Sequence, residues 1–206
     1  MLRALAVVIA LLALTPAYAA DNAYQALLTA AKRGDPVDWQ ALRFAYAESP
    51  DFDLLGSGAE DARKQMYADY RGGDFAGALQ QAASVLGHDY VDIDAHMVAD
   101  LAARKLGDEA QAKLHHDAAI GLLNSIRTGD GHTPETAYTV ITVGEEYAVL
   151  RAYGLRPSQQ ALISNGGHSY DRLDAIDHDG KTVTLYFLID RVLAAEDAAL
   201  NGKPKP

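Results

Sequence analysis

The chain has 206 residues, of which 49% are hydrophobic and 22% charged, a composition typical of globular proteins. It carries 18 lysines and arginines against 28 aspartates and glutamates, a formal net charge of −10. Such an acidic surface repels nucleic acid and anionic lipid, and long basic stripes are absent, so we exclude nucleic-acid binding. Because the chain has 0 cysteines, disulfides, thiolate nucleophiles and cysteine-ligated metals are excluded as well.

Residues 1–19 have the organisation of a signal peptide. A short positive segment, "MLR", precedes the uncharged run "ALAVVIALLAL", and "TPAYA" then supplies a breaker followed by small residues. Ala17, Tyr18 and Ala19 fit the A-x-A rule, so we expect cleavage after Ala19. The apolar run is too short to span a bilayer comfortably, and no cysteine is present for lipid attachment. We therefore expect a periplasmic or secreted protein with no membrane anchor after cleavage.

Residues 20–127 are expected to form a region of helical hairpins. The stretches "YRGGDFAGAL" and "ARKLGDEAQAKL" each place a Gly-Asp turn between two helical patterns. The two turns, at Gly73 and Gly107, are 34 residues apart, which is the period of a tetratricopeptide repeat. A looser third copy surrounds Gly34, where Pro36 is expected to open the second helix. The pattern predicts stacked, tetratricopeptide-like hairpins.

Residues 128–200 are expected to form a small antiparallel sheet with one helix, which makes the fold class α+β. The runs "TAYTVITV" (136–143) and "QQALIS" (159–164) are strand-like, whereas "EEYAVLRAY" (145–153) has the pattern of an amphipathic helix. The final segment, "NGKPKP" (201–206), is polar and contains proline, so we predict a disordered tail.

A hairpin is predicted near the end of this second region. The strand-like runs "HSYDRLDAID" and "KTVTLYFLID" flank Asp179 and Gly180, a pair that favours a tight turn. A two-residue turn at that position would place Asp174 opposite Leu185 on the apolar face of the sheet. Either a β-bulge shifts the register or that face is not uniformly dry.

The loop "GDGHTPETAY" (129–138) lies where the two regions meet. Its Asp130, His132 and Glu135 could form an acid–base pair or ligate a metal ion. Glycine, proline and polar residues in this density are equally typical of a solvated loop, and a threonine before proline can cap a helical turn. We interpret the loop as a hinge between two architectures and predict neither a metal site nor a cofactor.

The segment 121–155 carries the most specific likeness to a known family. It reads "GLLNSIRTGDGHTPETAYTVITVGEEYAVLRAYGL", and "HSYDRLDAID" and "TVTLYF" follow it. The stretches "YVDIDAHMVADLAARKLGD" and "FAYAESPDF" fit the same group. The chain thus resembles, over nearly all of its length after the predicted cleavage, an exported bacterial group called domain-of-unknown-function family 4919. The resemblance implies no activity, cofactor or catalytic residue.

A polar stripe on the predicted helix 91–106 is the candidate binding groove. Asp92, His96 and Asp100 are spaced at i, i+4 and i+8, so they share one helix face. A groove between this helix and the predicted helix 59–71 would use the three side chains as its polar contacts. The alternative is a solvated stripe held by i,i+4 pairing, since a metal site would need further ligands from another element.

The candidates for catalysis are His132, His168 and Asp171. The stretch "NGGHSYD" combines a Gly-Gly turn with a base, a hydroxyl and a carboxylate. However, neighbouring residues of a strand point to opposite faces, and no G-x-S-x-G motif is present, so we assign no catalytic residue. By helical phase His115 is expected to be packed inside, and the pair Glu145 and Glu146 is explained by the helix dipole.

These observations favour an exported protein-interaction module with a helical-repeat groove, whose partner is another envelope or secreted protein of neutral or basic character. The alternative is a hydrolase-like enzyme, or a binder of a small ligand or metal, at the junction of the helical and α+β parts. A third possibility is a structural envelope protein without a dedicated groove.

Overall fold

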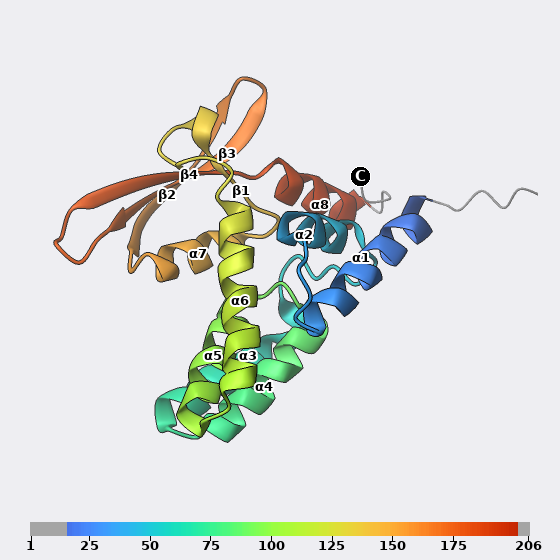
Figure 1. The fold of residues 1–206 in the computed structure, drawn as a ribbon. Coiled ribbons are helices and arrows are strands. Elements are labelled where there is room, and N and C mark those ends of the chain that lie inside the picture. Colours follow the sequence, from blue (N-terminus) through green and yellow to red (C-terminus); the bar gives the residue numbers. More distant parts are fainter. Residues whose placement is uncertain (1–15, 202–206) are drawn as a thin grey trace, which may run out of the picture.

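The computed structural model describes residues 16–201 and has the predicted α+β architecture (Figure 1). Most of the predicted signal peptide and residues 202–206 of the predicted tail lie outside the described residues. The helices are α1 (Pro16–Lys32), α2 (Trp39–Glu48), α3 (Glu60–Gly72), α4 (Phe75–His88), α5 (Ile93–Leu106), α6 (Glu109–Ile126), α7 (Val143–Ala152) and α8 (Asp190–Asn201). Two 3-10 turns, η1 (Ser57–Ala59) and η2 (Pro134–Thr136), separate some of them. Within residues 16–201, no helix is both long and apolar enough to cross a membrane.

Helices α3 to α6 pack successively on one another, and the two predicted Gly-Asp turns connect them. Gly73 and Gly107 end α3 and α5 with φ angles of 83° and 78°, which favour glycine. The aspartates that follow cap the next helices: Asp74 accepts from the backbone N–H of residue 77 at 2.9 Å, and Asp108 from that of residue 111 at 3.0 Å. The turns are therefore capping devices, while the tetratricopeptide-like assignment stays a prediction.

The first hairpin differs from the prediction that Pro36 opens its second helix. Gly34 ends α1 with a φ of 75°, but α2 begins only at Trp39. The carboxylate of Asp38 accepts the backbone N–H of Ala41 at 3.0 Å and so acts as the N-cap. Because this cap defines the first turn, Pro36 lies in the extended linker before the helix.

Replacement of Gly121 on α6 by alanine is expected to destabilise the protein. A Cβ added there would lie 2.2 Å from Nε1 and 2.4 Å from Cδ1 of Trp39, because α2 packs directly on the α6 backbone. Alanine in a helix gains about 1 kcal/mol over glycine, whereas overpacking costs about 1–3 kcal/mol. We expect urea unfolding to show that Gly121→Ala lowers stability in the wild-type protein. In a protein that already carries Trp39→Ala, the same substitution should raise stability. A Gly121→Ala protein as stable as the wild type would contradict this packing.

The sheet is mixed, with the strand order β1-β4-β3-β2. Strands β2 (Arg156–Asn165), β3 (His168–Ile176) and β4 (Thr182–Leu188) pair antiparallel as predicted, but β1 (Tyr138–Thr139) pairs parallel with β4. The strand predicted over 136–143 is thus cut to two residues. The turn η2 occupies its beginning, and the Thr142 hydroxyl caps α7 by accepting the backbone N–H of residue 145 at 3.3 Å.

The hairpin between β3 and β4 has a longer turn than a two-residue one. Backbone hydrogen bonds join Asp177 to Lys181 and Gly180 to Asp177, and Gly180 has a φ of 80°. Leu173 consequently lies opposite Leu185, and Asp174 lies opposite a threonine on the other face of the sheet. The apolar face predicted for β4 therefore stays dry at this position.

Helix α7 lies between the sheet and the helical stack, where it contacts both β2 and α5 (Figure 1). Buried side chains form one hydrophobic core that runs through both parts of the molecule. Its members come from the helices and the sheet alike and include Leu42, Met66, Ala99, Leu150 and Phe187. The two predicted regions thus share one hydrophobic core, and the surface between them is packed.

Candidate functional site

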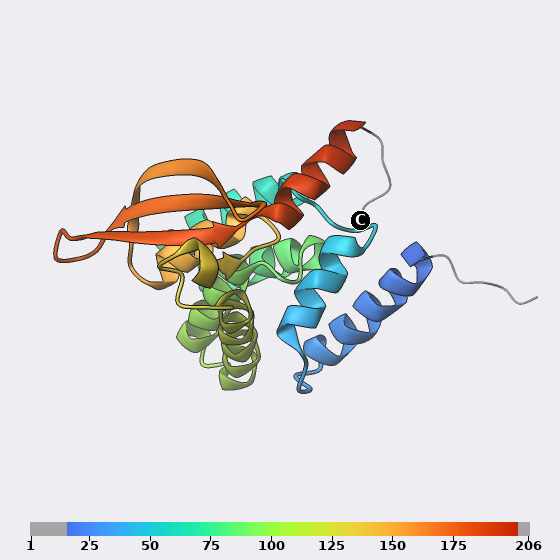
Figure 2. The same cartoon turned by 90° about the horizontal axis from the view of Figure 1, so that it is seen from above.

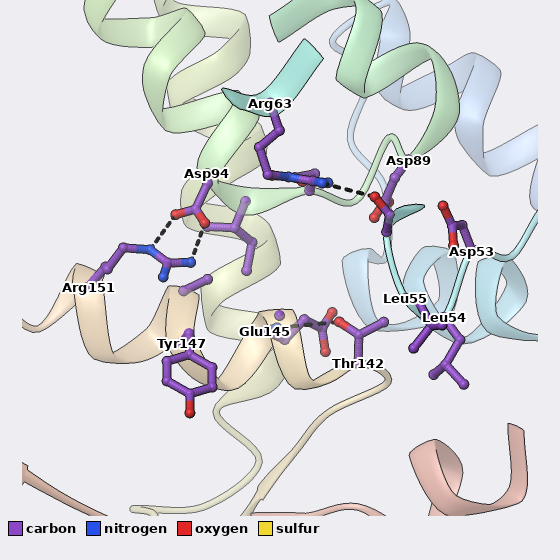
Figure 3. Close-up of a pocket in the computed structure, with 15 residues that line it drawn as sticks. Asp53, Leu54, Leu55, Arg63, Asp89, Asp94, Thr142, Glu145, Tyr147 and Arg151 are labelled. Carbon is purple, nitrogen blue, oxygen red and sulfur yellow. Dashed lines mark hydrogen bonds and ion pairs between the residues drawn. The ribbon is translucent and has the colours of Figure 1, made fainter. Parts of the chain in front are cut away.

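A cavity of about 270 Å³ opens at the junction of the helical stack and α7 (Figure 3). On the helical side it is lined by the loop 53–56, by Arg63 of α3, and by the turn and first residues of α5 over 89–94. On the other side it is lined by residues of the segment 142–151, which contains α7. We call this cavity the junction cleft. Its helical wall uses the same two helices that were predicted to form a groove.

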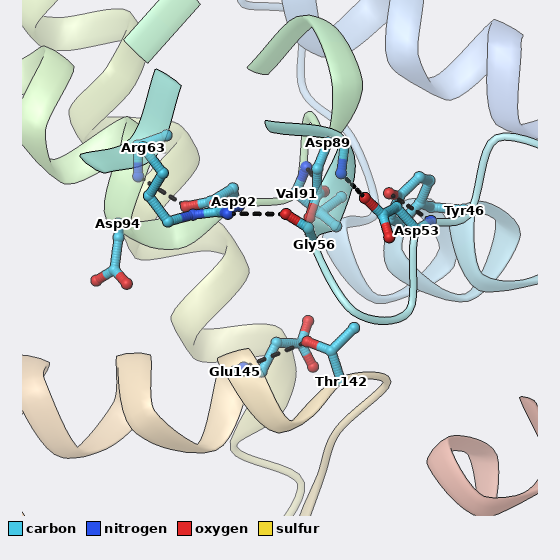
Figure 4. A network of polar contacts seen from close by, with 12 residues as sticks. Tyr46, Asp53, Gly56, Arg63, Asp89, Val91, Asp92, Asp94, Thr142 and Glu145 are labelled. Carbon is cyan, nitrogen blue, oxygen red and sulfur yellow. Dashed lines mark hydrogen bonds and ion pairs between the residues drawn. The ribbon is translucent and has the colours of Figure 1, made fainter. Parts of the chain in front are cut away.

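Two ion pairs hold opposite ends of the junction cleft. Arg63 donates to the Asp92 carboxylate at 2.6 Å and to the backbone carbonyl of Gly56 at 3.1 Å (Figure 4). Arg151 of α7 pairs with Asp94 of α5 and so bridges the two walls (Figure 3). Both arginines are therefore already engaged by carboxylates of the protein itself.

Asp53 is used by its own loop. Its carboxylate accepts the backbone N–H of Gly58 at 2.7 Å. Burial opposes the ionisation of Asp53, but hydrogen bonds from backbone N–H groups at residues 55–58 outweigh it and lower the pKa. Asp53 is thus a stable negative charge at the rim of the cleft.

Asp89 is a carboxyl group of the cleft that has no cation of its own and, unlike Asp53, a raised pKa. It lies between the Arg63 head group and Asp53 (Figure 3), and within residues 16–201 it forms no ion pair at 4.0 Å or less. One oxygen accepts the backbone N–H of Val91 at 3.0 Å. Burial and the neighbouring negative charge of Asp92 raise its pKa well above the ordinary value. A cation entering the cleft would reverse that shift.

The base of the cleft is a buried ion pair that sequence reasoning missed. The Arg43 guanidinium is fully buried, and its Nε and Nη2 donate to the two carboxylate oxygens of Glu145 at 2.6 Å each. Arg43 also donates to the Thr139 carbonyl at 2.9 Å, and Glu145 accepts the backbone N–H of Ile141 at 2.8 Å. The pair fastens α2 to α7 with a planar, bidentate geometry.

A second buried carboxyl, Glu146, faces away from the cleft. It is fully buried, and neither of its oxygens has a hydrogen-bond partner among the described residues. Burial, and after it the negative charge of Asp171 on β3, raises the pKa of Glu146 to about 9. Asp171 accepts a hydrogen bond from Gln160 at 2.7 Å. Glu146 is therefore a protonated acid at neutral pH, held beside a carboxylate.

The three predicted groove residues do not lie together in one groove. Asp92 lines the junction cleft and caps α5 by accepting the backbone N–H of residue 95 at 2.8 Å. His96 is 0% exposed and lies between α5 and α6, so in this conformation it offers no surface to a partner. Asp100 is 8% exposed and accepts from Arg104 at 2.6 Å and from His116 at 3.0 Å. Of the three, only Asp92 is brought to the cavity.

The environment of His96 is that of a packed core histidine. Its Nε2 lies 2.9 Å from the Tyr90 carbonyl, and its Nδ1 lies 3.0 Å from Nδ1 of His115. Burial and the neighbouring His115 lower the pKa of His96 to about 3, so the ring is neutral at physiological pH. His115, which was expected to be packed inside, is only half-buried on α6, where its ring contacts that of His96.

The candidate catalytic histidines are not brought together. Nδ1 of His132 lies 3.4 Å from the carbonyl of Thr184, which is opposite Asp174 in the sheet. His168 is six residues before Asp174 on the same strand, which corresponds to roughly 20 Å. His168 pairs with Asp190 at 2.5 Å, while Asp171 faces Glu146. No two of the three candidates can act on one substrate atom.

The polar groups of the loop 129–138 bond partly within the loop and partly to the neighbouring sheet. Asp130 accepts from the hydroxyl of Thr136 at 2.6 Å and from the backbone N–H of His132 at 3.0 Å. Glu135 accepts from Asn165 at 2.8 Å. In the described part of the chain, no group of three histidine, aspartate or glutamate residues is placed to hold a metal ion.

Fold and site together define an α+β protein with an acidic cleft between a helical stack and a sheet-bound helix. The family model described as "Domain of unknown function (DUF4919)" matches residues 17–198, so the chain belongs to this family. The resemblance stated from the sequence is thereby confirmed. No curated protein and no solved structure matches the chain.

Proposed function

We propose that this chain is an exported protein-interaction module, and that its junction cleft receives a basic side chain of a partner protein. The observation that carries the proposal is Asp89, a carboxyl group in the cleft with no cation of its own. Arg63 and Arg151 form ion pairs with Asp92 and Asp94. A lysine or arginine of a partner would pair with Asp89 in the same way.

The charges around the cleft favour a cation. Five carboxyl groups line the cleft. The arginines near them are three: Arg63 and Arg151 in the wall, and Arg43, which pairs with Glu145 from behind. The opening also carries apolar surface, including Leu55, which is 82% exposed, and Tyr147 of α7. The aliphatic stem of a lysine or arginine packs well on such surface while its charged end reaches a carboxylate.

The exported location is supported by the N-terminal pattern of charge, apolar run and small residues. The partner is then another envelope or secreted protein, with a basic residue in an exposed loop or tail. The strongly acidic character of the whole chain, with a net charge of −10, favours encounter with a basic partner.

A small cationic ligand is the second candidate, because the cleft volume of about 270 Å³ is close to that of small-molecule sites. An amine or a free basic amino acid would use the same Asp89 carboxylate. The two candidates differ in whether the peptide backbone around the basic residue contributes to binding.

Nuclear magnetic resonance titration of the purified protein tests the proposal. The probes are three capped tripeptides, Ala-Arg-Ala, Ala-Lys-Ala and Ala-Glu-Ala, and free arginine. We expect the two basic peptides to shift the amide signals of Asp89, Val91 and Tyr147, and the acidic peptide to shift none. Equal affinity for free arginine would favour the small ligand, and no shift with any basic probe would overturn both candidates.

The Asp89→Asn protein is expected to bind the basic peptides about tenfold more weakly, because the charge that meets the cation is lost. Binding to the wild type should tighten as pH rises, since a cation displaces the proton that the raised pKa of Asp89 retains. The matched control is Asp61→Asn, an exposed aspartate of α3 outside the cleft. Equal loss in both variants would show that only net charge matters.

A further inference from the structure

Strand β2 is an open edge of the sheet. The order β1-β4-β3-β2 leaves it with β3 as its only neighbour, and in the described part of the chain no other backbone hydrogen bonds reach it. Every residue of β2 is exposed except Ile163. In Figure 2, β2 is the orange strand that arches along the border of the sheet, next to β3. Its outer backbone groups are therefore accessible.

This edge lacks the usual protection against pairing with another strand. Residues 157–165 include no charged side chain, in a chain of which 22% is charged. Proteins ordinarily protect an open edge with lysine, inward-pointing charges, proline or a bulge. Here Pro157 and the bulge between Pro157 and Gln159 protect only the beginning of the strand. Seven residues, 159–165, remain regular and uncharged.

The turn that ends β2 determines which backbone groups point outward. Gly166 and Gly167 have φ angles of 60° and 86°, and Asn165 is paired with His168, so this is a two-residue hairpin. In such a hairpin the pair next to the turn exchanges hydrogen bonds, and every second pair does so thereafter. The residues between, Gln160, Leu162 and Ser164, therefore direct their N–H and C=O groups to the free edge.

We infer that β2 pairs antiparallel with β2 of a second copy of this chain, about a two-fold axis at Leu162. Leu162 is the middle residue of the uncharged stretch 159–165 and is 64% exposed. In this register Leu162 faces Leu162 of the copy, and Gln160 faces Ser164. All three outward-pointing residues then exchange backbone hydrogen bonds, and the two four-stranded sheets join into one of eight strands.

A second copy fits this edge better than a charged peptide does. The strand has no charge to attract a basic or acidic segment, but it is self-complementary about Leu162, as an isologous contact requires. The net charge of −10 on each copy lies elsewhere and is screened beyond about 8 Å at physiological salt. The inference does not depend on the function proposed for the junction cleft.

Disulfide trapping tests the register, because the natural chain has 0 cysteines. Across the axis the two Cα atoms of residue 162 would be about 5.5 Å apart, within the range of a disulfide. We expect the Leu162→Cys protein to form a disulfide-linked dimer under mild oxidation. Ser164→Cys is the matched control, since its two copies would be roughly 14 Å apart. Absence of a linked dimer with Leu162→Cys, or equal linking in both, would overturn the inference.

Sedimentation equilibrium tests the association itself. The wild-type protein is expected to form dimers as its concentration rises, and Leu162→Lys to raise the dimer dissociation constant at least about tenfold, because two like charges meet at the axis. Leu200→Lys, on α8 where the leucine is 84% exposed, should leave the dimer unchanged. A wild-type protein that stays monomeric up to about 1 mM would contradict the proposal.

Discussion

The Arg43→Met protein is expected to lose about 3–5 kcal/mol of its free energy of unfolding at neutral pH. The substitution removes the only guanidinium that contacts Glu145 among the described residues, and Glu145 is 5% exposed. A buried carboxylate without its counter-ion keeps the desolvation penalty and loses the compensating attraction. Urea unfolding followed by circular dichroism measures the difference.

Two controls separate this effect from simple loss of charge. The Arg43→Met, Glu145→Leu double variant should recover much of the stability, since replacing both partners of a buried pair is often neutral. Lys113→Met should change stability by less than about 1 kcal/mol, because Lys113 and Asp117 form an exposed i,i+4 pair. If Arg43→Met costs no more than Lys113→Met, the buried pair does not hold α2 to α7.

The Glu146→Gln protein is expected to be more stable than the wild type at pH 8, by on the order of 5 kcal/mol. The pKa of Glu146 is raised from 4.5 to about 9, so the folded protein retains a proton that the unfolded chain releases. Such a group has no effect on the free energy of unfolding below pH 4.5. As pH rises from 4.5 towards 9, the free energy of unfolding falls by about 1.4 kcal/mol per pH unit. Glutamine has no proton to release, and its amide can donate to Asp171.

The measurement is urea unfolding of both proteins at pH 5 and pH 8. The gain from Glu146→Gln should be small at pH 5 and grow with pH, which a change in packing alone would not produce. Glu109→Gln, at an exposed position on α6, is the control and should show a difference that is independent of pH. A gain that is equal at both pH values would refute the buried, protonated acid.

The helices and their turns could be predicted because the responsible interactions are local. A glycine with positive φ and an aspartate that caps the next turn lie within a few residues of each other, as at Gly73 and Gly107. The prediction for Pro36 failed for a local reason too: proline is allowed at the first position of a helix, but here Asp38 caps a helix that begins only at Trp39. The register of β3 against β4 was open for a related reason, since it depends on the length of the turn.

The candidate site could be predicted only in part. Helical spacing placed Asp92, His96 and Asp100 on one face, but spacing does not say which neighbour covers that face. The neighbour is α6, whose His115 and His116 contact His96 and Asp100. Arg43 and Glu145 are 102 positions apart, and no local pattern in either helix signals that the two will meet.

The buried pair also bears on the order in which the chain folds during synthesis. Helices α3 to α6 depend on neighbours close in sequence, so they can form as soon as they leave the ribosome. Arg43 emerges early but has no counter-ion until residue 145 has been made. Arg43 on α2 therefore remains without its counter-ion when the helices α3 to α6 have already been made. The pairing of Arg43 with Glu145 thus comes later in synthesis than the contacts among α3 to α6.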